Sequence, residues 1–514
     1  MKNKDNYIEF IRAEIDKYSE KTDFNETGKV ISINDGVAVV SGLKNAMLSE
    51  VVIFENKTKG MIMNLENSIV VVLILGQYKD IKEKSEVIRT KSIISIPIGT
   101  DILGRVLSPL GDPLDDLGII NNKRYSLIEK PAAGIMERSS VNEPLQTGIL
   151  LIDSMIPIGK GQRELIVGDR QTGKTTIAIN TIINQKGKNV KCVYVSIGQK
   201  NSSLAKIIKK LDNAGALQYT TIISASASDF DANKYLAPYS GIAIAEEWMN
   251  KGEDVLIVFD DLTKHAFAYR SISLLLKRPS GRESYPGDIF YLHSRLLERA
   301  CKLKEKGSIT ALPIIETQNN DISTYIPTNV ISITDGQLFL QTNLFNLGQK
   351  PAINVELSVS RIGSSAQNKV IKKLASSVKI ALAQYYDMLS FSQFGNEVDD
   401  DTKIILEKGK RINWIIKQNE SIAYEWIVEA QLLYLIFSNT IVYIPFESMG
   451  EFKNYYIQSC NESETWKQIE QMVEINKEQI EELNKWTLNL IYDFVSKLGK
   501  NDNEILKLIK KQLK

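Results

Sequence analysis

The sequence predicts three consecutive domains: a small β-barrel over residues 26–92, a parallel α/β domain over 93–373 and an α-helical bundle over 374–514. A single hydrophobic core rarely organises a chain of 514 residues, because domains of roughly 50–200 residues are the norm. The first domain is rich in short β-type runs, the second alternates strands with helices, and the third repeats apolar residues at helical spacing. Residues 1–25 place isoleucines at helical spacing among charged residues, so we expect a helical segment there.

The barrel is predicted from short runs of β-branched and aromatic residues. Residues 29–33, 37–40 and 51–54 are such runs, and Asn34-Asp35-Gly36 between the first two is a tight hairpin signal. Several strands of this length within one small region are typical of a β-barrel.

The central domain is predicted from strands that alternate with helical stretches. Its candidate buried strands are residues 190–195, 220–223, 255–259 and 308–312. This alternation indicates a largely parallel sheet with helices on both faces.

The last domain is predicted to be helical because it contains few helix breakers and a regular apolar stripe. Pro445 is the only proline after residue 374. The stripe recurs every three or four positions at Ile371, Leu374, Val378, Leu382 and Tyr385. Such a stripe is typical of the core of a helix bundle.

One octapeptide, Gly168-Asp-Arg-Gln-Thr-Gly-Lys-Thr175, carries the strongest functional signal. It matches the phosphate-loop pattern G-x-x-x-x-G-K-[ST], with an apolar strand before it and a helix after it. The helix N-terminus offers N–H donors, Lys174 is expected to pair with the β- and γ-phosphates, and the Thr175 hydroxyl to bind Mg²⁺. We therefore expect ATP or ADP with Mg²⁺ as cofactors, held by Gly168, Asp169, Arg170, Gln171, Thr172, Gly173, Lys174, Thr175 and Thr176.

Two further positions complete the expected site. The apolar residues 255–259 run directly into Asp260 and Asp261, so a carboxylate is expected to hold the Mg²⁺ water shell; we favour Asp260, with Asp261 as the alternative. The strand after the loop helix ends at Gln199, where a water-activating group usually stands. An amide can orient a water but cannot accept its proton. Some nucleotide hydrolases do orient water with a glutamine, so a self-sufficient hydrolase remains an alternative here.

Several longer segments resemble the alpha subunit of F-type ATPases. The phosphate loop is similar, and residues 197–200 carry a glutamine where the catalytic beta subunit has a glutamate. Further similar segments are residues 143–148, 277–288, 290–299, 327–336 and 357–364. The resemblance covers about residues 25–420 and implies a β-barrel, a RecA-like core and a helical bundle, in that order.

The resemblance also implies partners and a role. In this family three alpha and three beta subunits alternate in a ring around a gamma-type central shaft, with a peripheral stalk. The alpha site is expected to hold Mg-ATP without turnover, while Arg361 matches an arginine finger that acts in trans on the adjacent beta site. Such fingers raise rates by ~10³–10⁵-fold in other NTPases. Ser332 matches another residue near that interface, and Gln171 and Gln418 fall where the family contacts nucleotide.

Two departures from the family pattern bear on this role. Glu420 stands two residues after Gln418, where a second glutamine is usual. Beyond about residue 420 the resemblance is weak, and this tail normally faces the shaft. The second hypothesis is therefore an alpha-type subunit of a specialised motor that hydrolyses ATP to power another membrane-associated apparatus.

Composition argues against other classes. Lys and Arg total 63 against 62 Asp and Glu, so no net basic field favours nucleic acid. A hexameric nucleic-acid motor would also need aromatic residues on its barrel, whereas residues 26–92 contain only Phe54 and Tyr78. The three cysteines form no CxxC pair, and the N-terminus shows no apolar signal segment. We expect a cytoplasmic protein that meets the inner face of the cell membrane only through its complex.

Overall fold

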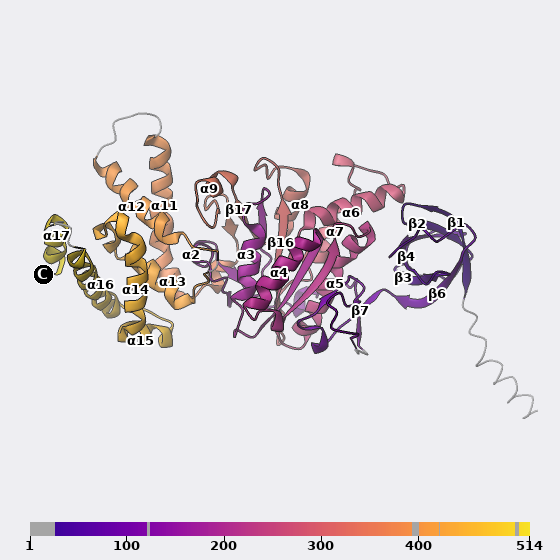
Figure 1. Ribbon diagram of the computed structural model, residues 1–514, viewed down its shortest axis with the longest axis horizontal. Helices are drawn as coiled ribbons and strands as arrows, with labels where there is room; N and C mark the ends of the chain where they lie inside the picture. The colour runs from indigo at the N-terminus through magenta and orange to yellow at the C-terminus, as the bar shows by residue number, and fades with distance from the viewer. Residues whose placement is uncertain (1–25, 121–123, 393–399, 421, 499–502, 514) are drawn as a thin grey trace, which may run out of the picture.

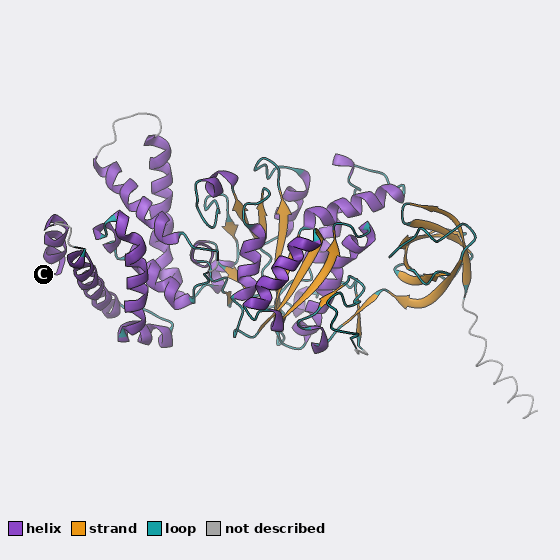
Figure 2. Cartoon of the chain, viewed as in Figure 1, coloured by secondary structure: helices purple, strands orange, loops and turns teal. Residues whose placement is uncertain are grey.

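The computed structural model describes residues 26–120, 124–392, 400–420, 422–498 and 503–513. Within them the chain forms a β-barrel, a central α/β domain and a C-terminal helical domain, which lie in a row (Figure 1, Figure 2). The type and order of these parts confirm the predicted fold class. The helical segment expected at residues 1–25 lies outside the described residues.

Antiparallel strands close the N-terminal barrel in the order β1-β2-β5-β4-β3-β6. Their bounds are β1 (Thr27–Asn34), β2 (Val37–Ser41), β3 (Glu50–Phe54), β4 (Lys59–Leu65), β5 (Ile69–Ile74) and β6 (Glu86–Ile93). Asp35 and Gly36 both have positive φ and turn the chain between β1 and β2, where the hairpin signal lies. Alternate side chains point inward and bury a small core of mostly β-branched residues.

The central sheet has the strand order β18-β17-β12-β16-β15-β13-β14-β8. The bounds are β8 (Val106–Leu107), β12 (Leu165–Gly168), β13 (Val190–Gln199), β14 (Thr220–Ser226), β15 (Asp254–Asp260), β16 (Ser308–Glu316), β17 (Gly336–Leu340) and β18 (Val359–Ser360). Strands β17 to β8 run parallel, whereas β18 pairs antiparallel with β17. The parallel strands therefore bring their carboxyl ends to one edge, where loops can meet around a ligand.

Two-stranded sheets flank the central one. They pair β7 (Ser95–Pro97) with β9 (Tyr125–Leu127), and β10 (Pro144–Leu145) with β11 (Ile158–Gly159). Short 3₁₀ helices lie at η1 (Thr100–Ile102), η2 (Ile135–Glu137), η3 (Leu217–Tyr219), η4 (Arg282–Ser284), η5 (Thr440–Tyr443) and η6 (Phe446–Ser448).

Helices cover both faces of the central sheet (Figure 1). Their bounds are α2 (Leu150–Met155), α3 (Lys174–Ile183), α4 (Asn201–Asn213), α5 (Asp231–Asn250), α6 (Leu262–Leu275), α7 (Ile289–Leu297), α8 (Tyr325–Ile333), α9 (Thr342–Asn346) and α10 (Gly363–Ala366). On β13, Cys192 and Tyr194 belong to the core beneath α3 and α4, whereas Val193 and Val195 belong to the core beneath α5 to α7. This period of two is what a strand buried on both faces requires.

The C-terminal domain is helical throughout. Its bounds are α11 (Lys369–Ser392), α12 (Asp400–Ile416), α13 (Trp426–Phe437), α14 (Met449–Glu462), α15 (Glu464–Met472), α16 (Lys477–Lys497) and α17 (Asn503–Leu513). Of the expected stripe on α11, Ile371, Leu374, Val378 and Leu382 are buried. One continuous apolar cluster joins α3 and one sheet face to α11 and α13, so this domain packs firmly on the central α/β domain. In the part of the chain that the structure describes, the helices are too short or too polar to cross a bilayer.

Candidate functional site

The phosphate-binding loop connects β12 to α3 at the carboxyl edge of the sheet. Gly173 precedes α3 with φ of 99°, a left-handed conformation that favours glycine. Gly168 lies so close to β17 that an added Cβ atom would come within 2.5 Å of the Leu340 carbonyl oxygen. Since the first amides of a helix lack intrahelical partners, α3 begins with N–H donors at the loop.

Asp169 anchors the loop. Its carboxylate accepts hydrogen bonds from Thr317 Oγ1 at 2.7 Å, from the Asn320 backbone N–H at 2.9 Å and from Thr342 Oγ1 at 3.3 Å. These partners follow β16 and β17, so Asp169 ties the loop to the neighbouring strands.

The next two loop residues are exposed. Arg170 pairs with Glu316 at the end of β16, and Gln171 adopts a positive φ of 61°. The structure thus places all residues of the predicted loop around one short turn, with Asp169 in an anchoring role.

Lys174 lies inside the loop. Its Nζ donates to the Gly168 carbonyl oxygen at 2.7 Å and to that of Asp169. Burial lowers the pKa of this ammonium, while surrounding carboxylates, Glu316 first, act to raise it. A cation enclosed by backbone amides and a helix N-terminus suits the binding of a phosphate chain.

Thr175 and Asp260 form a compact oxygen pair. Thr175 Oγ1 donates to Asp260 Oδ2 at 2.7 Å, and the Tyr194 hydroxyl donates to the same oxygen at 2.8 Å. A hydroxyl and a carboxylate are hard oxygen ligands of the kind that Mg²⁺ takes, so these residues fit the expected ion. Asp261 instead caps α6, where it accepts from the Lys264 N–H at 2.8 Å and pairs with Lys264 Nζ at 3.0 Å.

Gln199 ends β13 beside this pair. Its Nε2 lies 3.3 Å from both the Tyr194 hydroxyl and the Asp260 carbonyl oxygen. Together with the loop and Asp260 it lines a cleft of about 690 Å³, within the usual range of ligand sites. Tyr194 was not singled out from the sequence, although a tyrosine in an apolar strand five residues before Gln199 was an available signal.

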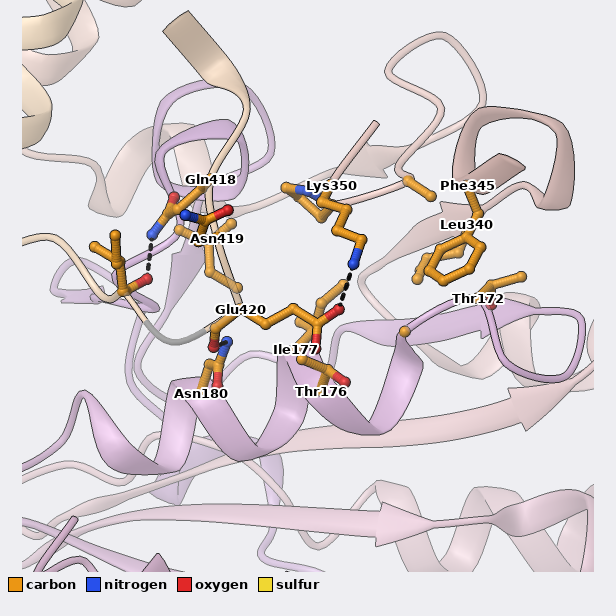
Figure 3. A pocket seen from close by; sticks show the side chains of 15 residues that line it. Thr172, Thr176, Ile177, Asn180, Leu340, Phe345, Lys350, Gln418, Asn419 and Glu420 are labelled. Carbon is orange, nitrogen blue, oxygen red and sulfur yellow. Dashed lines mark hydrogen bonds and ion pairs between the residues drawn. The ribbon is translucent and has the colours of Figure 1, made fainter. Parts of the chain in front are cut away.

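A second, more apolar pocket adjoins the loop along α3. Ile149, Ile177, Leu340 and Phe345 supply its apolar walls (Figure 3). This pocket and the cleft beside Gln199 share lining residues and therefore adjoin; the shared residues are Gly173, Thr176, Phe345 and Glu420.

Gln418 lies in the wall of this apolar pocket. Its Nε2 donates to the carbonyl oxygens of Gly148 at 2.6 Å and Ile422 at 2.7 Å, and its Oε1 accepts from the Leu150 N–H at 3.1 Å. The predicted contact residue is thus near the nucleotide space, with its amide engaged by backbone. Lys350 and Phe345 in the same pocket had no motif to reveal them.

Arg361 and Ser332 lie near the opposite edge of the sheet from the loop. The Arg361 N–H donates to the Asp335 carbonyl oxygen at 2.9 Å, just before β17, and its side chain is exposed. Leu340, at the far end of β17, pairs with Gly168. Asp335 and Leu340 are five positions apart along this strand, a distance of about 16 Å. Ser332 is exposed on α8, and its hydroxyl donates to the Thr328 carbonyl oxygen at 2.9 Å.

The chain matches family models along most of its length. The β-barrel model of the ATP synthase alpha/beta family matches residues 23–91, the nucleotide-binding model residues 148–360 and the C-terminal model residues 367–489. The chain is 56% identical over 460 residues to ATP synthase subunit alpha of Mycoplasma genitalium, an alignment that covers 89% of each chain. It is 53% identical over 500 residues to ATP synthase subunit alpha of Mycoplasmoides gallisepticum, covering 96% of each. It is 53% identical over 504 residues to ATP synthase subunit alpha 1 of Mycoplasmopsis pulmonis, covering 98% of this chain and 95% of that one.

These matches correct one expectation about the tail. The family resemblance continues to residue 489, whereas the motifs indicated that it fades near residue 420. A helix bundle constrains apolar spacing more than particular residues, so reading by motif underestimates its similarity. With matches in all three domains and relatives above half identity, the chain belongs to the ATP synthase alpha/beta family, as a subunit of the alpha type.

Proposed function

We propose that this chain is a non-catalytic, nucleotide-binding subunit of a rotary ATPase, and that it supplies Arg361 to the catalytic site of an adjacent beta-type subunit. Its own site is proposed to hold ATP or ADP with Mg²⁺. Lys174 and the loop amides would bind the phosphates, and Thr175 with Asp260 would hold the ion, which shields phosphate charge. The 2.7 Å contact between Thr175 and Asp260 supports this assignment.

The amide side chain of Gln199 is the observation that supports a non-catalytic site. At the end of β13 this site presents an amide, which orients a water without taking its proton. Glu316, another carboxylate of the cleft, is engaged by Arg170. These contacts favour a binding site over the self-sufficient hydrolase.

The position of Arg361 supports a role in trans. Since Asp335, which Arg361 contacts, lies about 16 Å along the strand from the level of the loop, Arg361 is too distant to act on the phosphates of its own site. It is exposed, and its Nη1 makes one long contact of 3.5 Å with the Thr334 carbonyl oxygen. An exposed guanidinium with one long contact is available to a neighbouring subunit. There its fixed charge and planar donors suit a phosphoryl group. Exposed Ser332 on the adjoining helix is proposed to line the same interface.

The proposed partners are beta-type subunits in an alternating three-plus-three ring, a gamma-type shaft and a peripheral stalk, with membrane contact at the inner face of the cell membrane only through the complex. The nucleic-acid alternative has little support, because Phe54 is buried inside the barrel and Tyr78 packs against Phe230. The specialised-motor hypothesis drew on a weak tail resemblance, and the match through residue 489 removes that support.

The proposal is tested by ATP hydrolysis with the purified chain alone and with its beta-type partner. We expect no turnover by the chain alone, turnover by the mixture, and a loss of about 10³-fold or more with Arg361→Ala, as for other arginine fingers. Arg361→Lys keeps the charge but not the planar fork, and we expect it to recover little activity. Equal hydrolysis by the chain with and without its partner would overturn the proposal.

A further inference from the structure

The apolar pocket beside the loop is placed to receive the base of a nucleotide whose phosphates lie in the loop. It meets the loop at Thr172 and Gly173 and runs along α3 past Thr176. Its walls of Ile177 and Phe345 suit the faces of an aromatic ring (Figure 3). The hydrogen-bond donors and acceptors of the pocket determine which base it selects.

Three polar side chains of this pocket are already engaged with other parts of the chain. The Gln418 amide uses both N–H groups and its oxygen on backbone partners. Thr172 Oγ1 donates to a loop carbonyl oxygen at 2.8 Å. Asn180 donates to a carbonyl oxygen at 2.8 Å and accepts from a lysine at 3.0 Å. Since these side chains have part of their hydrogen-bonding capacity used and their orientation fixed by these partners, they are poorer candidates for base recognition than side chains free to turn.

Lys350 and Glu420 are in a different situation. Lys350 Nζ and Glu420 Oε1 lie 2.9 Å apart, and 46% and 52% of their side chains are exposed. Figure 3 shows the two side chains extending toward each other above α3. An ion pair this exposed contributes little to stability, so both groups can turn to a ligand at small cost. Together they place one strong donor beside one two-oxygen acceptor.

We propose that Lys350 and Glu420 recognise the edge of the nucleobase, and that this site accepts guanine nucleotides at least as well as adenine nucleotides. Guanine presents O6, an acceptor, next to the N1–H and N2–H₂ donors. The Glu420 carboxylate accepts from both donors, while the Lys350 ammonium donates to O6. Adenine offers one donor, N6–H₂, and one acceptor, N1, and so makes one contact fewer. The inference rests on the proposed binding of nucleotide at this loop.

The chemistry of Glu420 also predicts how the preference can be reversed. A glutamine at this position has one acceptor and one donor group, which match the N6–H₂ and N1 edge of adenine. Facing guanine, the amide nitrogen would oppose the N1–H or N2–H₂ donor. Glu420→Gln therefore tests the carboxylate while it keeps the size of the side chain.

The experiment is equilibrium binding of Mg-GTP and Mg-ATP to the purified full chain. For the wild type we expect GTP to bind at least as tightly as ATP. A bidentate base contact discriminates by about tenfold to a hundredfold, so Glu420→Gln should weaken GTP by that factor and change ATP by less than about threefold. Glu425→Gln, at an exposed carboxylate outside the pocket, is the matched control and should change neither.

Two results separate the possible failures. If the wild type binds ATP more tightly than GTP, or if Glu420→Gln leaves the ratio of the two affinities unchanged, the base-recognition inference is wrong while nucleotide binding stands. If neither nucleotide binds the wild type, the proposed nucleotide-binding function itself fails. Lys174→Ala should abolish binding of both, which would place the measured binding at this loop.

Discussion

Replacing Glu429 with glutamine should stabilise this protein at neutral pH. Glu429 lies on α13 and is 1% exposed, neither of its carboxyl oxygens has a hydrogen-bond partner among the described residues, and the carboxyl of Asp153 on α2 is a neighbouring charge. Asp153 is held by Thr147 Oγ1 at 2.7 Å and the Gly148 N–H at 2.9 Å. Ionising two neighbouring buried carboxyls together is costly, so the one with fewer hydrogen-bond donors keeps its proton. Since Asp153 already accepts hydrogen bonds from these donors, Glu429 is the residue that keeps the proton.

The magnitude follows from the pKa of Glu429. Burial first, and then the neighbouring charge of Asp153, raises this pKa well above its ordinary value of 4.5. An acid whose pKa is raised by folding costs nothing below the unfolded pKa, and destabilises the fold increasingly as pH rises toward the folded pKa. Each pH unit in that window costs about 1.4 kcal/mol, so the penalty at pH 7 is at most about 3.5 kcal/mol. Lys188, the nearby cation, opposes the shift.

Glu429→Gln removes this penalty because an amide does not ionise, and it keeps the size of the side chain. We expect no stabilisation near pH 4.5, a gain that grows with pH, and a limit of about 3.5 kcal/mol at pH 7. A chain of three domains does not unfold in one step, so the measurement is hydrogen exchange of the α13 amides, which reports the local opening free energy. Glu425→Gln, at an exposed carboxylate that faces the same Lys188 across 3.9 Å, is the control and should shift that free energy by less than about 0.5 kcal/mol. A variant gain that is equal at pH 5 and pH 8 would refute the reasoning.

Three further changes test other parts of the structure. Glu246→Gln leaves the buried Arg299 guanidinium without its carboxylate, at 2.6 Å in the wild type, and should destabilise the core by about 3–5 kcal/mol in thermal unfolding. Gly307→Ala would bring a Cβ atom to 1.8 Å from the Glu253 carbonyl oxygen and should greatly lower the melting temperature, whereas Gly287→Ala, with open space around it, should not. Thr175→Val should weaken Mg-ATP binding by about tenfold or more and leave Mg²⁺-free ATP unaffected, as measured by calorimetry; an equal loss in both would mean that the hydroxyl does not hold the ion.

Much of the fold was predictable because its signals are local. The phosphate loop is a contiguous motif, the strands from β13 to β16 are apolar runs, and the α11 stripe repeats within one helix. The pair of Thr175 with Asp260 was also expected, since parallel strands deliver their carboxyl ends to one edge.

The remaining features depend on contacts between distant segments. The neighbouring carboxyls of Asp153 and Glu429 come from α2 and α13, and neither residue belongs to a motif. Lys350 precedes Pro351 in a loop, and only the folded chain brings it to Glu420. A single sequence contains no periodicity that would reveal such pairs, because their geometry is set by how the helical domain packs on the core.

The same packing links the nucleotide space to the helical domain through one short segment, residues 146–149. Side chains near the end of α3 hold the Gln146 carbonyl oxygen, and Asp153 holds the next two N–H groups. The Gly148 carbonyl oxygen accepts from Gln418 Nε2 at 2.6 Å, just after α12, and from the Tyr424 N–H at 3.0 Å, just before α13. Ile149, the last residue of the segment, lines the apolar pocket beside the loop. A movement of α13 against the core must therefore break these contacts or displace Ile149, so we expect occupancy of the proposed nucleotide site to depend on the position of the helical domain.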